Sequence, residues 1–312
     1  MGGKPEAYEY VCRCRDGAQG ARFVSVIEPL FADDAFLDNI TRLETTASDK
    51  VIIAWLGQSG YLVSHCGFRF IIDPYLSDSL TRKYADTTKP HERISRMVIA
   101  PERLTGISFV TSSHNHTDHL DGETLAKLIG ANPGVKVIVP RANYTFALDR
   151  LVSAGVANAA NYLVDIPIRE TLTMSGIQGC TITAVPAAHE ALDTDENGDY
   201  RYYGYCITIA GQTIYHSGDC IPYDGLVAAV LPYKPDVALL PINGRDPSRG
   251  VSGNFSGPEA AELAQSLGVK HVIPNHYDLF AFNTADPQEF VDACEAISQP
   301  YRVLRLGEAF IL

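Results

Sequence analysis

The chain has 312 residues, of which 46% are hydrophobic, and its 25 Lys and Arg residues against 37 Asp and Glu residues give a formal net charge of −12. This charge opposes non-specific attraction to nucleic acids and to anionic membrane surfaces, so we expect neither as a partner. No window approaches the ~18 uninterrupted apolar residues of a membrane span, and seven scattered cysteines without a Cys-x-x-Cys pair indicate reduced thiols. We therefore expect a globular, cytoplasmic protein.

Residues 1–48 are predicted to form an N-terminal extension, because they are polar and irregular. One helix is predicted near residues 33–44, where Leu37, Ile40 and Leu43 roughly follow helical spacing. Residues 49–312 are predicted to form one domain, since no linker or low-complexity tract interrupts them.

Short β-rich segments follow from Val51 onward. The runs VIIAWL, GYLVS and FRFIID are separated by turn sequences and predict a meander of antiparallel strands. A polar stretch then reaches about Leu104 and carries Arg82 and Lys83. Its length is typical of a functional loop, so we expect it to cover a site.

The rest of the chain alternates strands and helices. The runs ISFVTSS and VKVIVP are predicted strands, each followed by a segment of helical periodicity, DGETLAKLIG and RANYTFALDRLVSAG. A second β-rich stretch, CTITAVPAA to QTIYHSGD, precedes the strand DVALLPI, the helix GPEAAELAQSLG, the strand HVIPN, the helix DPQEFVDACEAI and a final strand YRVLRL. These two halves predict an α/β fold in which two sheets pack face to face with helices outside.

Histidines and carboxylates are concentrated in the segment HNHTDH, directly after a predicted strand. His114 and His116 are two residues apart, so a strand-like backbone projects both to one side, and a tight turn could direct Asp118 and His119 at a second position. The alternative is a polar loop whose histidines are satisfied by hydrogen bonds. Histidines crowded together in a buried site would repel one another and lower one another's pKa values, unless a bound cation organised them. The segment therefore predicts a site for Zn²⁺, Mn²⁺ or Fe²⁺.

The segment HNHTDH fits the His-x-His-x-Asp-His motif of the metallo-β-lactamase superfamily. Further residues of the types that this family uses follow in the same order: His189 in PAAHEALD, Asp219 in YHSGDC and His276 in IPNHYD. From about Val51 onward the chain resembles this family, and the resemblance implies an αββα sandwich of two mixed sheets with two divalent metal ions at one edge, Zn²⁺ first among them and Mn²⁺ or Fe²⁺ as alternatives.

The same resemblance implies a ligand set. It assigns three histidines to one metal, namely His114, His116 and His189. It assigns Asp118, His119 and His276 to the other metal, and it places Asp219 between the two. A metal-bridged water then supplies hydroxide near neutral pH, and Asp118 is the candidate catalytic residue that takes or relays the proton.

Three segments, TIYHSGD, NGRDPSRG and HVIPNHYDLFAFNTADPQEF, most resemble the L-ascorbate-6-phosphate lactonase branch of the family. This resemblance implies a hydrolase that opens a lactone of a phosphorylated or carboxylated sugar-like molecule. Two alternatives stay open: a phosphodiesterase acting on a small phosphodiester, and an iron-dependent redox protein on the same scaffold. Homo-oligomerisation also stays open.

Candidate substrate residues lie close to the metal motifs. Arg245 and Arg249 follow a predicted strand, and guanidinium groups bind phosphate or carboxylate bidentately, although a solvated loop is the alternative. Tyr277 adjoins His276 and is expected to line the pocket.

Two further residues are expected to orient metal-bound groups through hydrogen bonds. Asp73 ends a predicted strand, where the family often has such a carboxylate, and His216 lies three residues before Asp219. For His216, a buried histidine satisfied at a strand end is an equal alternative. The histidines without partners at ligand spacing are expected to be structural: His65, His91 and His271.

Overall fold

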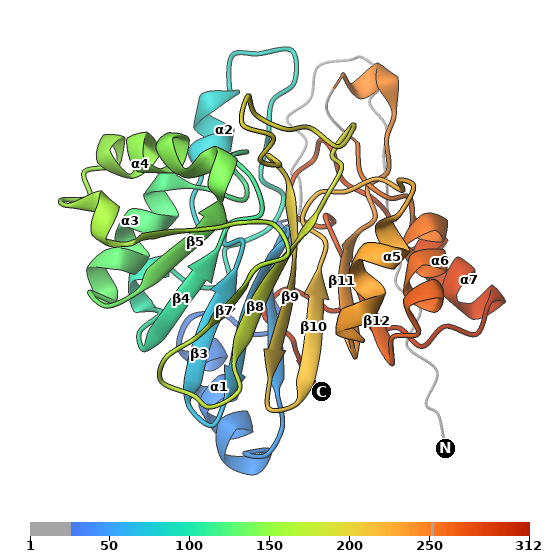
Figure 1. Cartoon of the computed structure of the whole chain (residues 1–312), viewed down its shortest axis with the longest axis horizontal. Helices are drawn as coiled ribbons and strands as arrows, with labels where there is room; N and C mark the ends of the chain where they lie inside the picture. Colours follow the sequence, from blue (N-terminus) through green and yellow to red (C-terminus); the bar gives the residue numbers. More distant parts are fainter. Residues whose placement is uncertain (1–25, 251–252) are drawn as a thin grey trace.

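The computed structural model describes residues 26–250 and 253–312, which form two mixed β-sheets packed face to face with helices outside (Figure 1). The first sheet has seven strands in the order β13 (Ala309–Ile311), β1 (Ile52–Gly57), β2 (Gly60–His65), β3 (Phe68–Ile72), β4 (Ile107–Thr111), β5 (Lys136–Pro140) and β6 (Leu163–Ile166). The second has six, in the order β12 (His271–Asn275), β11 (Val237–Pro241), β10 (Gln212–His216), β9 (Tyr203–Ile209), β8 (Thr181–Pro186) and β7 (Thr171–Thr173). The predicted α/β sandwich is confirmed.

Each sheet joins an antiparallel part to a parallel part. In the first sheet β1, β2 and β3 form the predicted antiparallel meander, whereas β3 to β6 pair in parallel. In the second, β7 to β10 are antiparallel and β10 to β12 are parallel. Strands such as β11 are buried along their whole length, as expected where helices cover a parallel sheet.

Helices cover the outer faces of the sandwich (Figure 1). On the side of β4 and β5 lie α3 (Gly122–Ala131) and α4 (Tyr144–Ser153), and beside β11 and β12 lie α5 (Leu226–Val230), α6 (Gly257–Leu267) and α7 (Gln288–Ala296). Local signals fix the helix ends: Asp121 accepts a hydrogen bond from the backbone of Thr124 at the start of α3, and Ser256 and Glu259 form a capping box at the start of α6. No helix in the described ranges has both the length and the apolar character needed to cross a bilayer.

The helix α1 (Asp33–Thr46) packs as part of the domain. Its Phe36, Ile40 and Leu43 are buried in the main hydrophobic core, and each such side chain contributes roughly 1.5–3 kcal/mol when fully removed from water. The predicted extension 1–48 therefore contains a helix that packs on the core of the domain, and the division of the chain at residue 48 stays a prediction. Residues 1–25 of that extension lie outside the described residues.

The predicted last strand, YRVLRL, is wrong. Tyr301 makes only an isolated bridge to Val272 at the edge of the second sheet, and Gly307, with a φ of 75°, then turns the chain toward the first sheet. There Ala309–Ile311 pairs antiparallel with β1 as β13. Alternating apolar residues favour a strand, but pairing also needs a free sheet edge beside them.

Candidate metal centre

Loops at one end of the sandwich bring the histidine motif together with distant residues. The segment HNHTDH lies between β4 and α3, His189 follows β8, Asp219 follows β10, and His276 follows β12. Arg150 of α4 braces the motif: its Nη1 donates to the carbonyl oxygens of Asn115 at 2.9 Å and Leu120 at 2.8 Å.

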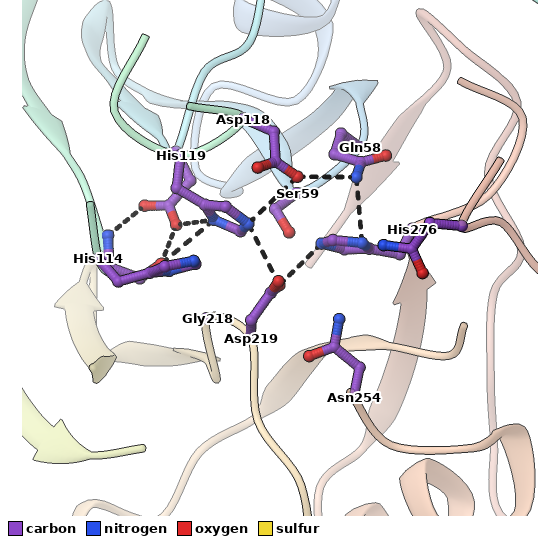
Figure 2. A network of polar contacts seen from close by, with 12 residues as sticks. Gln58, Ser59, His114, Asp118, His119, Gly218, Asp219, Asn254 and His276 are labelled. Atoms are coloured by element: carbon purple, nitrogen blue, oxygen red, sulfur yellow. Dashed lines mark hydrogen bonds and ion pairs between the residues drawn. The ribbon is translucent and has the colours of Figure 1, made fainter. Parts of the chain in front are cut away.

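Two groups of potential metal ligands form here, and within each group the ligand atoms lie within 4.8 Å of one another. The first group is His114, His116, His189 and Asp219, and the second is Asp118, His119 and His276. Asp219 lies between them: its Oδ1 is 3.2 Å from Nε2 of His119 and 2.8 Å from Nε2 of His276 (Figure 2). Its Oδ2 is 3.5 Å from Nε2 of His189. The grouping matches the one that the family resemblance implies.

The ligand atoms that face the centre fit a bound cation. Nε2 of His114 is buried without a hydrogen-bond partner. Nε2 of His119 and Nε2 of His276 are buried as well, and both face Oδ1 of Asp219. Buried polar atoms without partners are costly, and imidazole nitrogens with carboxylates are a donor set that divalent metals bind. The residues present therefore fit a metal ion.

Two ligands of the centre, His114 and Asp219, are held by their surroundings in the protonation states that bind metals. Burial holds the pKa of His114 well below its usual range, and the neighbouring His119 and His116 act in the same direction. For Asp219, burial alone raises the pKa, but His276 and His119 outweigh it and hold the pKa well below the usual value. These two ligands thus combine a neutral imidazole with an ionised carboxylate. For His119, burial lowers the pKa, but Asp219, Asp118 and Asp73 outweigh it and hold the pKa well above its usual range.

Asp73 orients His119, as expected from the sequence. Its carboxylate is fully buried and accepts hydrogen bonds from Nδ1 of His119 at 2.7 Å and from the backbone N–H of Ser113 at 3.0 Å. Because Nδ1 donates to Asp73, Nε2 of His119 is left as the ligand atom that faces the centre. In the same way, Nδ1 of His189 donates to the carbonyl oxygen of Gly253 at 2.9 Å.

Of the two interpretations of His216, the contacts agree with the buried histidine satisfied at a strand end: its ring bonds to the backbone before Asp219 and not to the Asp219 carboxylate. The N–H of Gly218 donates to Nδ1 of His216 at 3.2 Å, so the ring proton is on Nε2, which donates to the carbonyl oxygen of Ser59 at 3.1 Å. Gly218 has a φ of 59°, and a Cβ there would lie 2.5 Å from the carbonyl oxygen of Tyr203. The turn that presents Asp219 therefore needs glycine.

Gln58, in the tight turn between β1 and β2, belongs to the centre although residue type alone did not indicate it. Its Nε2 lies 2.9 Å from Oδ2 of Asp118 and 3.1 Å from Nδ1 of His276 (Figure 2). The available signal was topological, because the GQSG turn ends at the same edge as the histidine motif.

A cavity of about 1420 Å³ opens over the centre, and His116, Asp118, His189 and Asp219 are among its lining residues. The polar stretch after β3 supplies one wall, as expected, through α2 (Ser79–Lys83) and the residues up to His91. The helix α4 and the loop 245–250 supply others. The metal ligands are thus accessible to a small molecule.

Comparison with known proteins agrees with this geometry. Residues 68–277 match the family described as beta-lactamase superfamily domain. The chain belongs to the beta-lactamase superfamily. A "UPF0173 metal-dependent hydrolase" of Caldivirga maquilingensis is 27% identical over 251 residues, which cover 80% of this chain and 92% of the relative.

Two solved structures share the fold. The metallo hydrolase Igni18 from Ignicoccus hospitalis aligns with a TM-score of 0.60 at 24% identity, over 84% of this chain and 98% of its own. An isothiocyanate hydrolase from Delia radicum gut bacteria aligns with a TM-score of 0.65 at 18% identity, over 83% of this chain and 98% of its own. The resemblance to the lactonase branch of the superfamily stays a prediction.

In this member of the superfamily, the two arginines expected to bind substrate are engaged with the protein. Arg245 lines the cavity but pairs bidentately with Glu259, at 2.6 Å and 2.5 Å. Arg249 is not among the lining residues: its Nη1 donates to Oδ1 of Asn283 at 3.0 Å and its Nη2 to the carbonyl oxygen of Asn243 at 2.7 Å. Arg249 thus holds the loop together through these two contacts, and its binding of an anion stays a prediction.

Tyr277 also differs from expectation. Its ring is buried and stacks on Trp55 with 4.3 Å between ring centroids, and its hydroxyl donates to the carbonyl oxygen of Leu304. The side chain points into the core because His276, with a φ of 65°, reverses the chain direction just before it. His91, expected to be structural, packs against the rings of Tyr84 and Phe280 and is also among the residues that line the cavity.

Proposed function

We propose that this protein is a metal-dependent hydrolase that holds two divalent ions and opens a lactone of a small anionic molecule. The observation that carries the proposal is the pair of ligand groups that share Asp219, with their buried atoms directed at a common centre under an open cavity. The relatives described as metal-dependent hydrolases support the reaction class.

Divalent cations bound at these groups would polarise a carbonyl oxygen and lower the pKa of water, with Zn²⁺ as the first choice and Mn²⁺ or Fe²⁺ as alternatives. His114, His116 and His189 would hold one ion, Asp118, His119 and His276 the other, and Asp219 both. Asp73 and the Gly253 carbonyl keep the Nε2 atoms of their histidines available by accepting from Nδ1.

Asp118 lines the cavity and is the residue best placed to handle a proton. Burial and Asp219 act to raise its pKa, but His119 outweighs them and the pKa is lowered, so the carboxylate is ionised at neutral pH. Gln58 donates to Oδ2 of Asp118 and fixes its orientation. In ring opening of a lactone, Asp118 would accept the proton from the attacking water and pass it to the leaving alkoxide oxygen.

The test is metal analysis of protein purified without chelators, followed by a hydrolysis screen over lactones and phosphodiesters. We expect two equivalents of a divalent metal per chain, and lactone hydrolysis that a chelator abolishes and added metal restores. Protein that contains only trace metal would contradict the proposal. Turnover of phosphodiesters alone would keep the metal centre and replace the substrate class, and an iron centre without hydrolysis would favour the redox alternative.

A further inference from the structure

The cavity walls carry several cations, and their partners differ. The lining residues with a permanent positive charge are Lys83, Lys89, Arg150 and Arg245. Arg245 is neutralised by Glu259, and Nζ of Lys89 donates to the carbonyl oxygen of Gly250 at 2.8 Å, which ties the polar stretch after β3 to the loop 245–250. These two side chains therefore have protein partners already.

Arg150 is a guanidinium without an ion-pair partner among the described residues: burial lowers its pKa, and Asp121 and Asp118 act on it in the opposite direction only from a distance. Its Nη1 is used by two backbone carbonyls, and within residues 26–250 and 253–312 no carboxylate lies at ion-pair distance from it. Its plane lies over Phe146, 4.5 Å from the ring centroid, and this stacking holds the group in place. Nε and Nη2 remain for a second, bidentate partner in the cavity.

Lys83, the last residue of α2, is the second cation of the cavity for which the described residues provide no ion-pair partner. Its Nζ lies 5.0 Å from the Tyr84 ring centroid, and no carboxylate of the described residues pairs with it. Lys83 and Asp118 both act on the ring of His91. Burial lowers the pKa of His91, the Asp118 carboxylate raises it, and the Lys83 ammonium lowers it, so the charge of Lys83 is felt on the same side of the cavity as that of Asp118.

The elements that carry Lys83 and Arg150 belong to one side of the molecule. Arg82 of α2 pairs with Glu123 of α3, and α3 packs beside α4 (Figure 1). A phosphate or carboxylate is the ligand chemistry that one arginine fork and one lysine point charge recognise together.

We propose that Lys83 and Arg150 bind a phosphate or carboxylate group of the substrate, at the cavity wall formed by α2 and α4. This inference rests on the proposed hydrolase function in one respect, namely that the cavity is the substrate site. It replaces the loop 243–250 as the anion site with a wall that includes Lys83 of the polar stretch, which the sequence predicts to cover a site, and Arg150, which the residue pattern did not indicate.

The test is calorimetric titration of the metal-loaded protein with a hexose 6-phosphate and with the unphosphorylated hexose. We expect the wild type to bind the phosphate form more tightly, and Lys83→Met and Arg150→Lys each to raise its Kd by roughly 10-fold, the effect of losing one charge-assisted contact. Lys127→Met, which changes a remote cation that pairs with Glu102 at 3.5 Å, is the matched control and keeps the wild-type Kd. Arg245→Met tests the competing arginine of the same cavity.

Metal content and thermal unfolding are measured for every variant, because Arg150 also braces the histidine motif. Lys83 makes no contact with that motif, so its variant tests the site even if the Arg150 variant loses metal. Wild-type affinity in the Lys83→Met variant, or loss of affinity in Arg245→Met alone, would overturn the proposal, as would equal binding of the two sugars. Phosphate binding without any hydrolysis of lactones would instead count against the proposed function and leave this site standing.

Discussion

The side-chain amide of Gln58 donates to Oδ2 of Asp118 at 2.9 Å, joining the first β-turn of the domain to the histidine motif 60 residues further along. Gln58 is 3% exposed and holds a left-handed backbone conformation with a φ of 49°. Such a conformation is uncommon outside glycine and is retained where the surrounding structure requires it. Gln58 therefore fixes the direction of the Asp118 carboxylate.

Replacing Gln58 with leucine should lower kcat by roughly 10- to 100-fold, because Asp118 loses a hydrogen bond to a charged acceptor in a buried site. Substrate KM should change much less, since Gln58 acts through Asp118. The measurement is steady-state kinetics with a lactone, alongside metal analysis. Gln299→Leu removes another buried glutamine, one that bonds only to backbone carbonyls, and should leave kcat unchanged. Equal losses in both variants would mean that Gln58 matters only for stability.

Substituting ligands of the two groups separately should remove metal ions separately. His116→Ala and His276→Ala each delete one predicted ligand, so we expect each variant to retain at most one equivalent where the wild type retains two. Inductively coupled plasma analysis measures this directly. His65→Ala, a histidine bonded to the Lys50 carbonyl far from the cavity, is the control and should keep both ions. Unchanged metal content in His116→Ala would remove it from the ligand set.

Gly218→Ala should destabilise the protein and weaken metal binding together. The new Cβ would lie 2.5 Å from the Tyr203 carbonyl oxygen and 2.7 Å from Cβ of Ser113, so the turn before Asp219 must shift. Left-handed strain and overpacking each cost roughly 1–3 kcal/mol. Gly211→Ala is the matched control, because Gly211 also has a positive φ, 74°, but a Cβ there meets nothing within 4 Å. Urea unfolding should show a larger loss for Gly218→Ala, and equal losses would refute the steric argument.

The sequence predicts most of the fold because the patterns of apolar residues, turn residues and helix caps are local in the chain. The strands β1 to β3 alternate with short turns, and α6 carries its capping box and ends at Gly268. The features that the sequence does not predict depend on contacts between residues far apart in the chain. The side of α1 that faces the core can be recognised only when the first sheet is present, and β13 forms because β1 offers a free edge. The short edge strands β6 and β7 leave too few residues for a periodic signal.

The ligand set came from the resemblance of the motifs to the metallo-β-lactamase superfamily, and the structure brings these residues together in two groups. Gln58 and Arg150 could not be predicted, since glutamine and arginine are ordinary surface residues and only the fold brings them to the cavity. For Tyr277 and Arg249, proximity to a ligand or loop in the sequence gave no information on where each side chain points. Side-chain direction depends on backbone turns such as the one at His276.

The pairing of α1 with the first sheet should make stability depend on pH. Arg69 of β3 donates to Glu44 of α1 through two bonds, at 2.7 Å and 2.6 Å. Burial acts to raise the pKa of Glu44, but Arg69 outweighs it and the pKa lies below its usual value of 4.5. The stabilisation is therefore complete above that value and is lost as the pH falls through the lowered pKa.

Glu44→Gln should accordingly lower the free energy of unfolding at about pH 7, and its difference from wild type should shrink at about pH 3. Denaturant titrations at the two pH values measure this. Glu262→Gln, an exposed carboxylate on α6, should show no such dependence. A difference that stays constant down to the acid value would mean that the charge of Glu44 does not contribute.

Arg249→Ala should weaken the metal centre and not the recognition of an anion. Arg249 donates to the Asn243 carbonyl, and Oδ1 of Asn243 accepts from Nδ2 of Asn254 at 2.9 Å. The neighbouring residue, Gly253, supplies the carbonyl that orients His189. Loss of support for a ligand typically lowers metal affinity by roughly 10- to 100-fold, so we expect a change of that size in a chelator competition assay.

The same variant separates the two possible anion sites. Since Arg249 does not line the cavity, Arg249→Ala refilled with metal should bind a hexose 6-phosphate with the wild-type Kd, whereas Lys83→Met should not. Arg249→Lys should recover little metal affinity, because one ammonium cannot replace a guanidinium that reaches both Asn283 and Asn243. If Arg249→Ala instead kept its metal and lost phosphate binding, the loop 243–250 would be the substrate handle after all.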